Sequence, residues 1–160
     1  MGAWAEILAG LLGRRPPHLQ VGALCLRERS GQTEVLLITS LGTGRWIIPK
    51  GWPMRGRTLS GAALQEAWEE AGVKGWVAKT PIGRFSYLKA QDNGLALNCE
   101  VHVFKVRTAS VSERFPEAGR RERHWMPLPQ AVDLVHEQGL KSLLLAAADD
   151  STVVSKGRNG

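Results

Sequence analysis

Apolar and polar residues alternate along the chain in a way that predicts short strands around one amphipathic helix. Residues 18–29 and 34–40 have the composition of strands, and Ser30-Gly31-Gln32 between them is typical of a turn. A shorter apolar run follows at residues 46–49. We therefore expect the first two segments to pair as strands, with the third leading into the helix.

Two further strands are predicted over residues 76–87 and 95–107, and the Asn93-Gly94 dipeptide between them is a strong hairpin signal. Side chains alternate between the two faces of a strand. The second strand should therefore place Cys99, Val101 and Val103 on one face and Glu100, His102 and Phe104 on the other. A single histidine on a mixed face is usually solvated, and we expect this of His102.

The last third of the chain changes in character several times. Residues 109–123 are polar and charged and predict a long loop, of the kind that often carries function. Residues 124–128 predict a strand, and Pro129 lies where a helix begins. The remaining predicted segments are helices over 131–138 and 140–148, broken at Gly139, and a flexible polar tail over 151–160.

The N-terminal residues 1–13 have apolar positions at helical spacing and are followed by Arg14-Arg15-Pro16-Pro17. A secretory signal carries its basic residues before the apolar run, and a membrane span needs about 20 apolar residues. Glu6 occupies the position where a myristoylation motif has Ser or Thr. We expect residues 1–17 to form a helical extension that packs on the domain or on a second subunit, and no membrane association.

The helix predicted to end at Ala71 carries an unusual set of charges. Glu66, Glu69 and Glu70 are spaced i, i+3 and i+4, which places their side chains within an arc of roughly 100°. Gly72 follows as a helix-ending glycine should. The residues expected to pack on the opposite side of this helix are Leu64, Ala67, Trp68 and Ala71.

Three carboxylates on one helical face repel one another by a few tenths of a kcal/mol per pair in water. A hard divalent cation reverses that sign, and Mg²⁺ is usually held by a few carboxylates, water and substrate phosphates. Taken alone, three such acids more often belong to an ordinary solvated helix face. The residues around the helix therefore decide between a metal site and a solvated surface.

A short strand and glycine loop, Trp46-Ile47-Ile48-Pro49-Lys50-Gly51, lie before the helix, and a glycine ends it. This arrangement resembles the Nudix box. The residues in register with that motif are Gly51, Glu66, Ala67, Glu69, Glu70, Gly72 and Val73. Arg57 stands where the family has its first glutamate, and Gln65 stands where it has an arginine.

The two departures bear on activity. Gln65 still donates hydrogen bonds but carries no charge. Arg57 inverts a charge, and two readings remain open for it. It is a cation that holds substrate, or it marks a domain that binds phosphates without cleaving them.

The resemblance implies an α/β protein, a Nudix-type α/β/α sandwich with a central mixed β-sheet, over residues 18–150. It implies metal-dependent hydrolysis of a pyrophosphate bond, with Mg²⁺ or Mn²⁺ held by Glu66, Glu69, Glu70 and the main-chain carbonyl of Lys50. Glu66 and Glu69 would be catalytic residues, and the base would be Glu69 or an acid of the later loop. The loop acids are Glu113, Glu117 and Glu122, of which we favour Glu117. The predicted phosphate contacts are Lys50, Arg55 and Arg57.

Three segments are most similar to hydrolases of diphosphoinositol polyphosphates and diadenosine polyphosphates. They are RWIIPKG, AALQEAWEEAGVKG and GRRERHWMPL. The expected substrate is therefore a small phosphorylated molecule that is diphosphoinositol-type or linked through a nucleoside diphosphate. Hydrolysis of an RNA 5′-end is the alternative that involves nucleic acid, because a shared fold does not settle the substrate.

Composition and charge agree with a single domain that binds anions. The chain has 160 residues, a formal net charge of +6 and a pI of about 9.8. This charge favours anionic partners, but the sequence contains no recognised nucleic-acid module. Cys25 and Cys99 lack the spacing of metal ligands, so we expect buried, reduced thiols and a cytoplasmic protein, with a homodimer as a further possibility.

Overall fold

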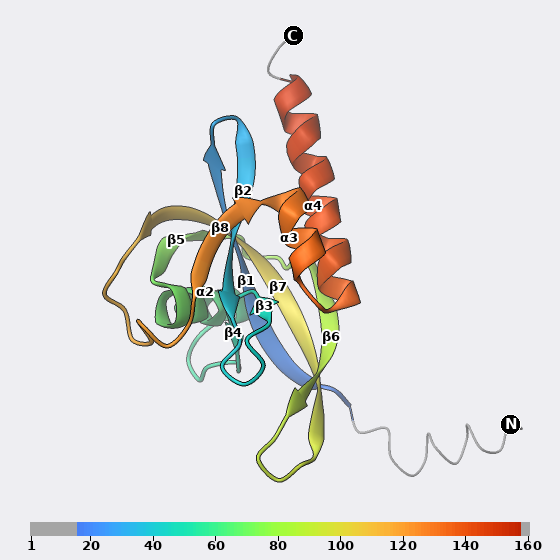
Figure 1. The fold of residues 1–160 in the computed structure, drawn as a ribbon. Helices are drawn as coiled ribbons and strands as arrows, with labels where there is room; N and C mark the ends of the chain where they lie inside the picture. The colour runs from blue at the N-terminus through green and yellow to red at the C-terminus, as the bar shows by residue number, and fades with distance from the viewer. Residues whose placement is uncertain (1–15, 158–160) are drawn as a thin grey trace, which may run out of the picture.

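The computed structural model describes residues 16–157 and is built around an eight-stranded sheet (Figure 1). Its strands are β1 (His18–Arg29), β2 (Gln32–Thr39), β3 (Trp46–Ile47), β4 (Lys50–Gly51), β5 (Val73–Val77), β6 (Gly83–Ala90), β7 (Ala96–Val111) and β8 (Arg123–Pro127). The helices are α2 (Leu59–Ala71), α3 (Leu128–Leu134) and α4 (Gln138–Gly157). The predicted N-terminal helix of residues 1–13 lies outside the described residues.

The sheet is mixed, as predicted. Its central order is β3-β2-β1-β7-β5, while β4 pairs with β1, β6 with β7 and β8 with β2. β1 and β7 are parallel, from His18 opposite Cys99 to Leu26 opposite Arg107, and the other pairings are antiparallel. This parallel pair joins segments that are far apart in the sequence at the centre of the molecule.

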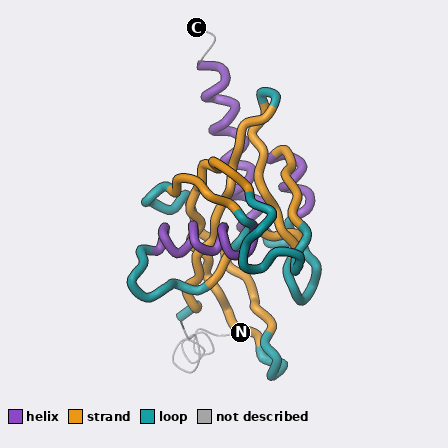
Figure 2. The backbone as a smooth tube through the Cα atoms, turned by 90° about the vertical axis from the view of Figure 1, so that its left-hand side faces the viewer, coloured by secondary structure: helices purple, strands orange, loops and turns teal. Residues whose placement is uncertain are grey.

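Helices cover both faces of the sheet, α2 on one side and α3 and α4 on the other (Figures 1 and 2). Two buried clusters fill the layers between them. Val21, Ala23 and Cys25 of β1 pack under α2, whereas Leu24 and Leu26 pack under α3 and α4. Because both faces of β1 are covered, its sequence is a nearly continuous apolar run rather than an alternating one.

The same layering confirms the alternation predicted for β7. Val101 and Val103 belong to the cluster under α3 and α4, whereas Phe104, on the face shared with Glu100 and His102, belongs to the cluster under α2. Its side chain is only 2% exposed, because α2 covers this part of the sheet. His102 is half-buried and its Nε2 lies 2.9 Å from Glu100 Oε1.

The strand predicted over residues 76–87 is wrong in its bounds, because the chain there forms the separate strands β5 and β6. Between them Ala78 N donates to Lys105 O and Ile82 N donates to Val103 O, so the chain stays beside β7 while its ladder is interrupted. Pro81 has no N–H to donate to that ladder. The predicted Asn93-Gly94 turn does join β6 to β7, with Gly94 at φ 80°.

Both ends of α2 are fixed by local hydrogen bonds. Thr58 Oγ1 accepts from Gly61 N at 3.0 Å at the start of the helix. Gly72 has φ 70° and donates to the carbonyls of Ala67 and Trp68 at its end. The left-handed conformation of Gly72 is one that residues with a side chain rarely adopt, which explains this glycine.

The buried side of α2 is made of small residues, which let the helix lie close to the sheet. They are Ala62, Ala63, Ala67 and Ala71. Trp68, which we expected to pack inward, is only half-buried, and Lys74 Nζ lies 4.7 Å from its ring centroid. The prediction of a packing face was therefore right for the alanines and wrong for the tryptophan.

The two cysteines are free and buried, as expected. α4 continues to Gly157, so the backbone of the first residues of the predicted tail is helical. Within residues 16–157, no helix combines the length and the apolar content that crossing a bilayer requires.

Candidate active site

Glu66 and Glu70 are the most deeply placed acids of α2, with 8% and 7% of their surfaces exposed. They are one turn apart on the same side of the helix, which turns them toward the strands rather than toward solvent. Gly51 of β4 lies against Glu66, and a Cβ atom at position 51 would overlap the Glu66 carboxylate. The glycine therefore creates the space in which this carboxylate sits.

Burial changes the protonation of both acids. It raises the pKa of Glu66 to about 7, and the charges of Glu70 and Glu69 add to the effect. Burial also raises the pKa of Glu70 to about 7, against the opposing influences of Arg121 and of the Lys50 backbone N–H. Removal from water therefore outweighs the nearby positive charge of Arg121, which lowers both pKa values.

Glu69 faces the same region but is less buried. Gln65 Nε2 donates to Glu69 Oε1 at 3.0 Å, so the residue that replaces the family arginine still orients this acid. The loop that follows β7 is tied to the same turn of the helix, because Glu117 N donates to the main-chain oxygen of Glu69 at 3.0 Å. This contact brings the Glu117 side chain to the acids of α2.

Lys50 joins the acidic region to the opposite side of the site. Its backbone N–H donates to Glu70 Oε2 at 3.1 Å. Its side chain extends away from that contact, with Nζ 4.4 Å from the centroid of the Tyr87 ring. Burial lowers the pKa of this lysine, and the neighbouring Glu70 partly offsets the effect.

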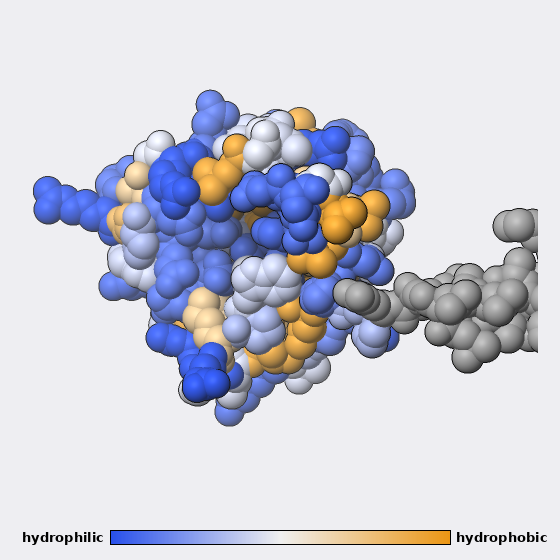
Figure 3. Space-filling view, turned by 90° about the horizontal axis from the view of Figure 1, so that it is seen from below, coloured by the Kyte–Doolittle hydropathy of each residue, from blue (hydrophilic) through white to orange (hydrophobic). Residues whose placement is uncertain are grey.

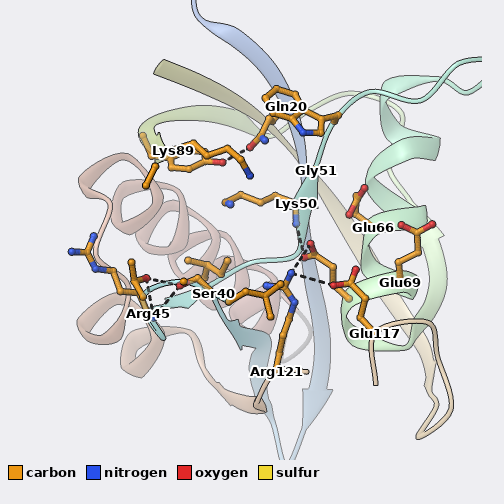
Figure 4. Close-up of a pocket in the computed structure, with 18 of the residues that line it drawn as sticks. Gln20, Ser40, Arg45, Lys50, Gly51, Glu66, Glu69, Lys89, Glu117 and Arg121 are labelled. Carbon is orange, nitrogen blue, oxygen red and sulfur yellow. Dashed lines mark hydrogen bonds and ion pairs between the residues drawn. The ribbon is translucent and has the colours of Figure 1, made fainter. Parts of the chain in front are cut away.

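These side chains line a cavity of about 600 Å³. Figure 4 shows Glu66, Glu69 and Glu117 on one side of it, and we call these residues together with Glu70 the carboxylate wall. Lys50, Lys89 and Arg45 lie across from them, Arg45 with its guanidinium directed away from the acids, and we call these three the cationic wall. The face of the molecule seen from below in Figure 3 is largely hydrophilic, with apolar residues in separate patches.

Other residues complete the lining. Gln20 and Tyr87 are hydrogen-bonded to each other, with the Tyr87 hydroxyl donating to Gln20 Oε1 at 2.5 Å. Trp52 is 42% exposed at the same cavity. Lys89 Nζ lies 5.8 Å from the centroid of the Trp52 ring. The cationic wall is therefore supported by aromatic rings, against which lysine charges are stabilised.

The structure brings together most of the residues singled out in the sequence. Glu66, Glu69, Glu70, Glu117 and Lys50 all line the cavity. Arg55 and Arg57 are exposed and are not part of that lining.

The two other loop acids also lie outside the lining of the cavity. Glu113 points outward with its side chain 90% exposed and pairs with Arg123 at 3.0 Å. Glu122 is exposed as well, and its backbone N–H donates to Thr39 Oγ1.

Sequence reasoning missed Arg45, Lys89 and Arg121 as site residues. Arg121 belongs to the basic run GRRERH, which was visible as a cluster of charge. Its side chain is 9% exposed, and its Nη2 lies 3.3 Å from Glu70 Oε1 and 3.3 Å from Glu117 Oε1. Lys89 and Arg45 had no comparable signal, because only the folding of their hairpin and loop brings them to the cavity.

The donors of the carboxylate wall suit a hard cation. Within residues 16–157, no group of three or more His, Cys, Asp or Glu side chains is arranged closely enough to hold an ion by itself. Mg²⁺ is normally bound through one or two carboxylates, with water and substrate phosphate completing its shell. The buried oxygens of Glu66 and Glu70, in the space that Gly51 leaves open, fit this mode of binding.

Comparison with known proteins gives a consistent result. The model of the NUDIX domain matches residues 16–146. Nudix hydrolase 12, a mitochondrial protein of Arabidopsis thaliana, is 30% identical over 115 residues, which are 69% of this chain and 56% of the relative. The chain thus spans little more than half the length of that relative.

A second relative matches over more of its own length. Diphosphoinositol polyphosphate phosphohydrolase 3-beta of Homo sapiens is 30% identical over 141 residues, with 83% of each chain covered. Among solved structures, an Ap4A hydrolase from C. elegans superposes with a TM-score of 0.57 at 20% identity, covering 80% of this chain and 93% of that one. At this identity the superposition is evidence for the fold alone.

Proposed function

Because this chain belongs to the Nudix family, we propose that it hydrolyses a pyrophosphate bond in a small phosphorylated substrate, with the help of a divalent cation. One observation carries the proposal. A single cavity has buried carboxylates on one wall and lysine side chains on the other (Figure 4). Such a site can hold a cation and a polyphosphate chain side by side.

The carboxylate wall would hold Mg²⁺ or Mn²⁺. The ligands proposed are Glu66, Glu69, Glu70 and the main-chain carbonyl of Lys50. When bound, the ion would neutralise phosphate oxygens and acidify a water molecule. Glu66 and Glu70 are suited to this task because their burial makes their negative charge costly until a cation arrives.

The reaction needs a base for the attacking water. Glu69 and Glu117 are the two candidates, because both line the cavity and both are more exposed than Glu66 and Glu70. The water oxygen would form a bond to phosphorus while the bridging P–O bond breaks. The carboxylate would take the proton of the water, and the leaving phosphate would carry away the electron pair of the broken bond.

The cationic wall would bind the phosphates that do not react. Lys50 and Lys89 are held near aromatic rings and point into the cavity (Figure 4). Fixed cations at such positions offset the charge of a polyphosphate as it reorganises. The human relative is named as a diphosphoinositol polyphosphate phosphohydrolase, which favours a diphosphoinositol-type substrate or one linked through a nucleoside diphosphate.

The proposal is tested by measuring phosphate release from a panel of substrates with Mg²⁺, with Mn²⁺ and with a chelator. The panel contains diphosphoinositol phosphates, dinucleoside polyphosphates, ADP-ribose and triphosphorylated RNA. We expect turnover of at least one small-molecule substrate that requires the metal. Turnover of the RNA in preference to all the others would instead identify an RNA 5′-end pyrophosphohydrolase.

Three variants locate the chemistry. Glu69→Gln, Glu70→Gln and Glu117→Gln remove single charges from the carboxylate wall without changing side-chain volume. Loss of general base catalysis typically lowers the rate by 10²–10⁴-fold. Whichever of Glu69→Gln and Glu117→Gln removes the base should therefore release phosphate more slowly by about that factor. Glu113→Gln is the matched control, because Glu113 is on the same loop but is exposed outside the cavity.

Two outcomes would overturn the proposal. Undiminished turnover in the three variants would place the site elsewhere. Tight binding of a panel member without turnover under any condition would indicate a phosphate-binding protein, the alternative that the Arg57 substitution raised.

A further inference from the structure

Arg121 lies between the two segments that supply the carboxylate wall. It precedes β8, and its guanidinium reaches Glu70 on α2 and Glu117 on the loop after β7. Its Nη1 also donates to Thr39 O at 3.1 Å. The positive charge of Arg121, whose side chain is 9% exposed, therefore lies among the acids that face the cavity (Figure 4).

The hydrogen bonds that hold this guanidinium are poor ones. A single nitrogen, Nη2, serves both carboxylates, and both distances are 3.3 Å. Charge-assisted N–H···O⁻ bonds are usually about 2.7–2.9 Å, and arginine–carboxylate pairs are often bidentate. Arg121 Nε is buried and has no hydrogen-bond partner in the structure. The pairing compensates charge, but its geometry is far from optimal.

A buried carboxylate cluster needs a cation whether or not a metal is present, since leaving the charges unpaired costs several kcal/mol per ion. Arg121 supplies that cation from within the chain. One of the acids that it contacts, Glu70, is also a proposed metal ligand. A divalent cation and a guanidinium at van der Waals distance from one carboxylate would repel each other strongly.

We infer that Arg121 is an internal counter-ion of the carboxylate wall, which pairs with Glu70 and Glu117 in the metal-free protein and is displaced when a divalent cation binds. The inference rests on the metal site of the proposed function. Arg121 is a positioning residue in this scheme, because it acts through the two acids. It makes metal binding weaker than the carboxylates alone would make it, while stabilising the protein without metal.

The test measures the stability of the metal-free protein and its affinity for Mn²⁺. If Arg121 were only a structural support, its removal would lower both. Thermal unfolding in a chelator reports the metal-free protein, and calorimetric titration with Mn²⁺ at pH 8 reports metal affinity without substrate. Arg121→Met should lower the unfolding midpoint in the chelator. It should also tighten Mn²⁺ binding by roughly tenfold, or ~1.4 kcal/mol.

Two further variants serve as controls. Arg121→Lys keeps the charge in a more compact group and should stay close to the original protein in both measurements. Arg114→Met removes the same charge from the same loop, but Arg114 is exposed. It should leave the unfolding midpoint unchanged and alter the Mn²⁺ affinity by less than about twofold. A general effect of net charge would appear in both methionine variants.

Weaker Mn²⁺ binding by Arg121→Met, together with a lower midpoint, would overturn the inference and identify Arg121 as a structural support. Unchanged binding would overturn it as well. Glu70→Gln distinguishes this failure from failure of the proposed site. If Glu70→Gln leaves Mn²⁺ binding intact, the metal site itself is misplaced, whereas loss of binding in that variant keeps the site.

Discussion

The two walls of the cavity are built in different ways. Three of the four acids in the carboxylate wall come from five consecutive residues of one helix, and the fourth is tied to that helix by a backbone hydrogen bond. The cationic wall takes Arg45 from a loop, Lys50 from β4 and Lys89 from β6. One wall is a local structure, and the other exists only because distant segments meet.

The electrostatic conditions of the walls differ as well. In the carboxylate wall, burial raises the pKa of Glu66 and of Glu70 to about 7, so these two acids resist ionisation below neutral pH. The lysines across the cavity lie near Tyr87 and Trp52, where aromatic faces stabilise a cation. In the proposed function, the carboxylate wall is the part of the site that depends on an added cation. The cationic wall would receive phosphate without an added group.

Among the tests that compare the two walls, the largest effect is expected from closing the space behind the carboxylate wall. Gly51→Ala places a methyl group where the Glu66 carboxylate now sits and forces that side chain to move. Misplacement of a reacting group by about 1 Å can cost 10²-fold in rate, and we expect a loss of kcat of that order. Steady-state kinetics on the best panel substrate measure it.

Gly42→Ala is the matched control for that variant, because a Cβ at position 42 meets no atom within 4 Å. Its kcat should remain within about twofold of the original value, as for most substitutions away from a close contact. Equal losses in the two variants would mean that glycine flexibility, rather than space for Glu66, matters at position 51.

The cationic wall should affect binding rather than the chemical step. Lys89→Met removes one charge that faces the phosphates and should raise KM by roughly tenfold, as expected when a charge-assisted hydrogen bond worth about 1.5 kcal/mol is lost. Lys79→Met, at an exposed position outside the cavity, is the control and should leave KM unchanged. A lower kcat with constant KM in Lys89→Met would contradict the division of roles between the walls.

The pH dependence of stability separates the walls further. The pKa values of Glu66 and Glu70 rise from the usual 4.5 to about 7 on folding. Between these values the folded chain binds more protons than the unfolded chain, so the free energy of unfolding contributed by the pair falls as pH rises through this window. In a chelator, the unfolding midpoint should therefore drop by a few degrees from pH 5 to pH 8.

Two comparisons check the assignment of that pH effect. Saturating Mn²⁺ at pH 8 should recover the loss, because a ligand that binds only the folded state stabilises it. The double variant Glu66→Gln, Glu70→Gln should lose most of the dependence on pH in the chelator. A double variant that keeps the full drop would assign the effect to other groups.

The smallest effect is expected at Arg57. The sequence proposed Arg55 and Arg57 as phosphate contacts, but both are exposed and neither is in the lining of the cavity. Arg57→Met should therefore change KM by less than about twofold, as exposed charges usually do. A rise in KM as large as that of Lys89→Met would show that the loop carrying Arg57 closes over the substrate.

Much of the fold could be read from the sequence because its signals are local. The composition of β1 and β2, the Asn93-Gly94 turn and the capping glycine Gly72 each act over a few residues. The break between β5 and β6 was missed, because residues 78–82 follow β7 without forming a regular ladder. Alternation placed Phe104 on the correct face of β7, but the burial of that face depends on α2, which lies elsewhere in the sequence.

The candidate site divides along the same line. Helical periodicity alone puts Glu66, Glu69 and Glu70 on one face, since three or four residues make one turn. The sequence also favoured Glu117, but nothing in its spacing could choose it over Glu113 and Glu122. In the folded chain the hydrogen bond from Glu117 N to Glu69 O brings Glu117 to the acids of α2, whereas Glu113 is left exposed.

By itself, the sequence determined most of the strands, the acidic helix with its ends, and the family to which they belong. Tertiary structure alone decided which cations face the acids, where Arg121 lies and how deeply Glu66 and Glu70 are buried. The physical reason is the distance along the sequence over which each interaction acts. Local spacing specifies the turn of a helix or hairpin, whereas proximity across the cavity depends on the parallel pairing of β1 with β7 and on the covering of both faces of the sheet.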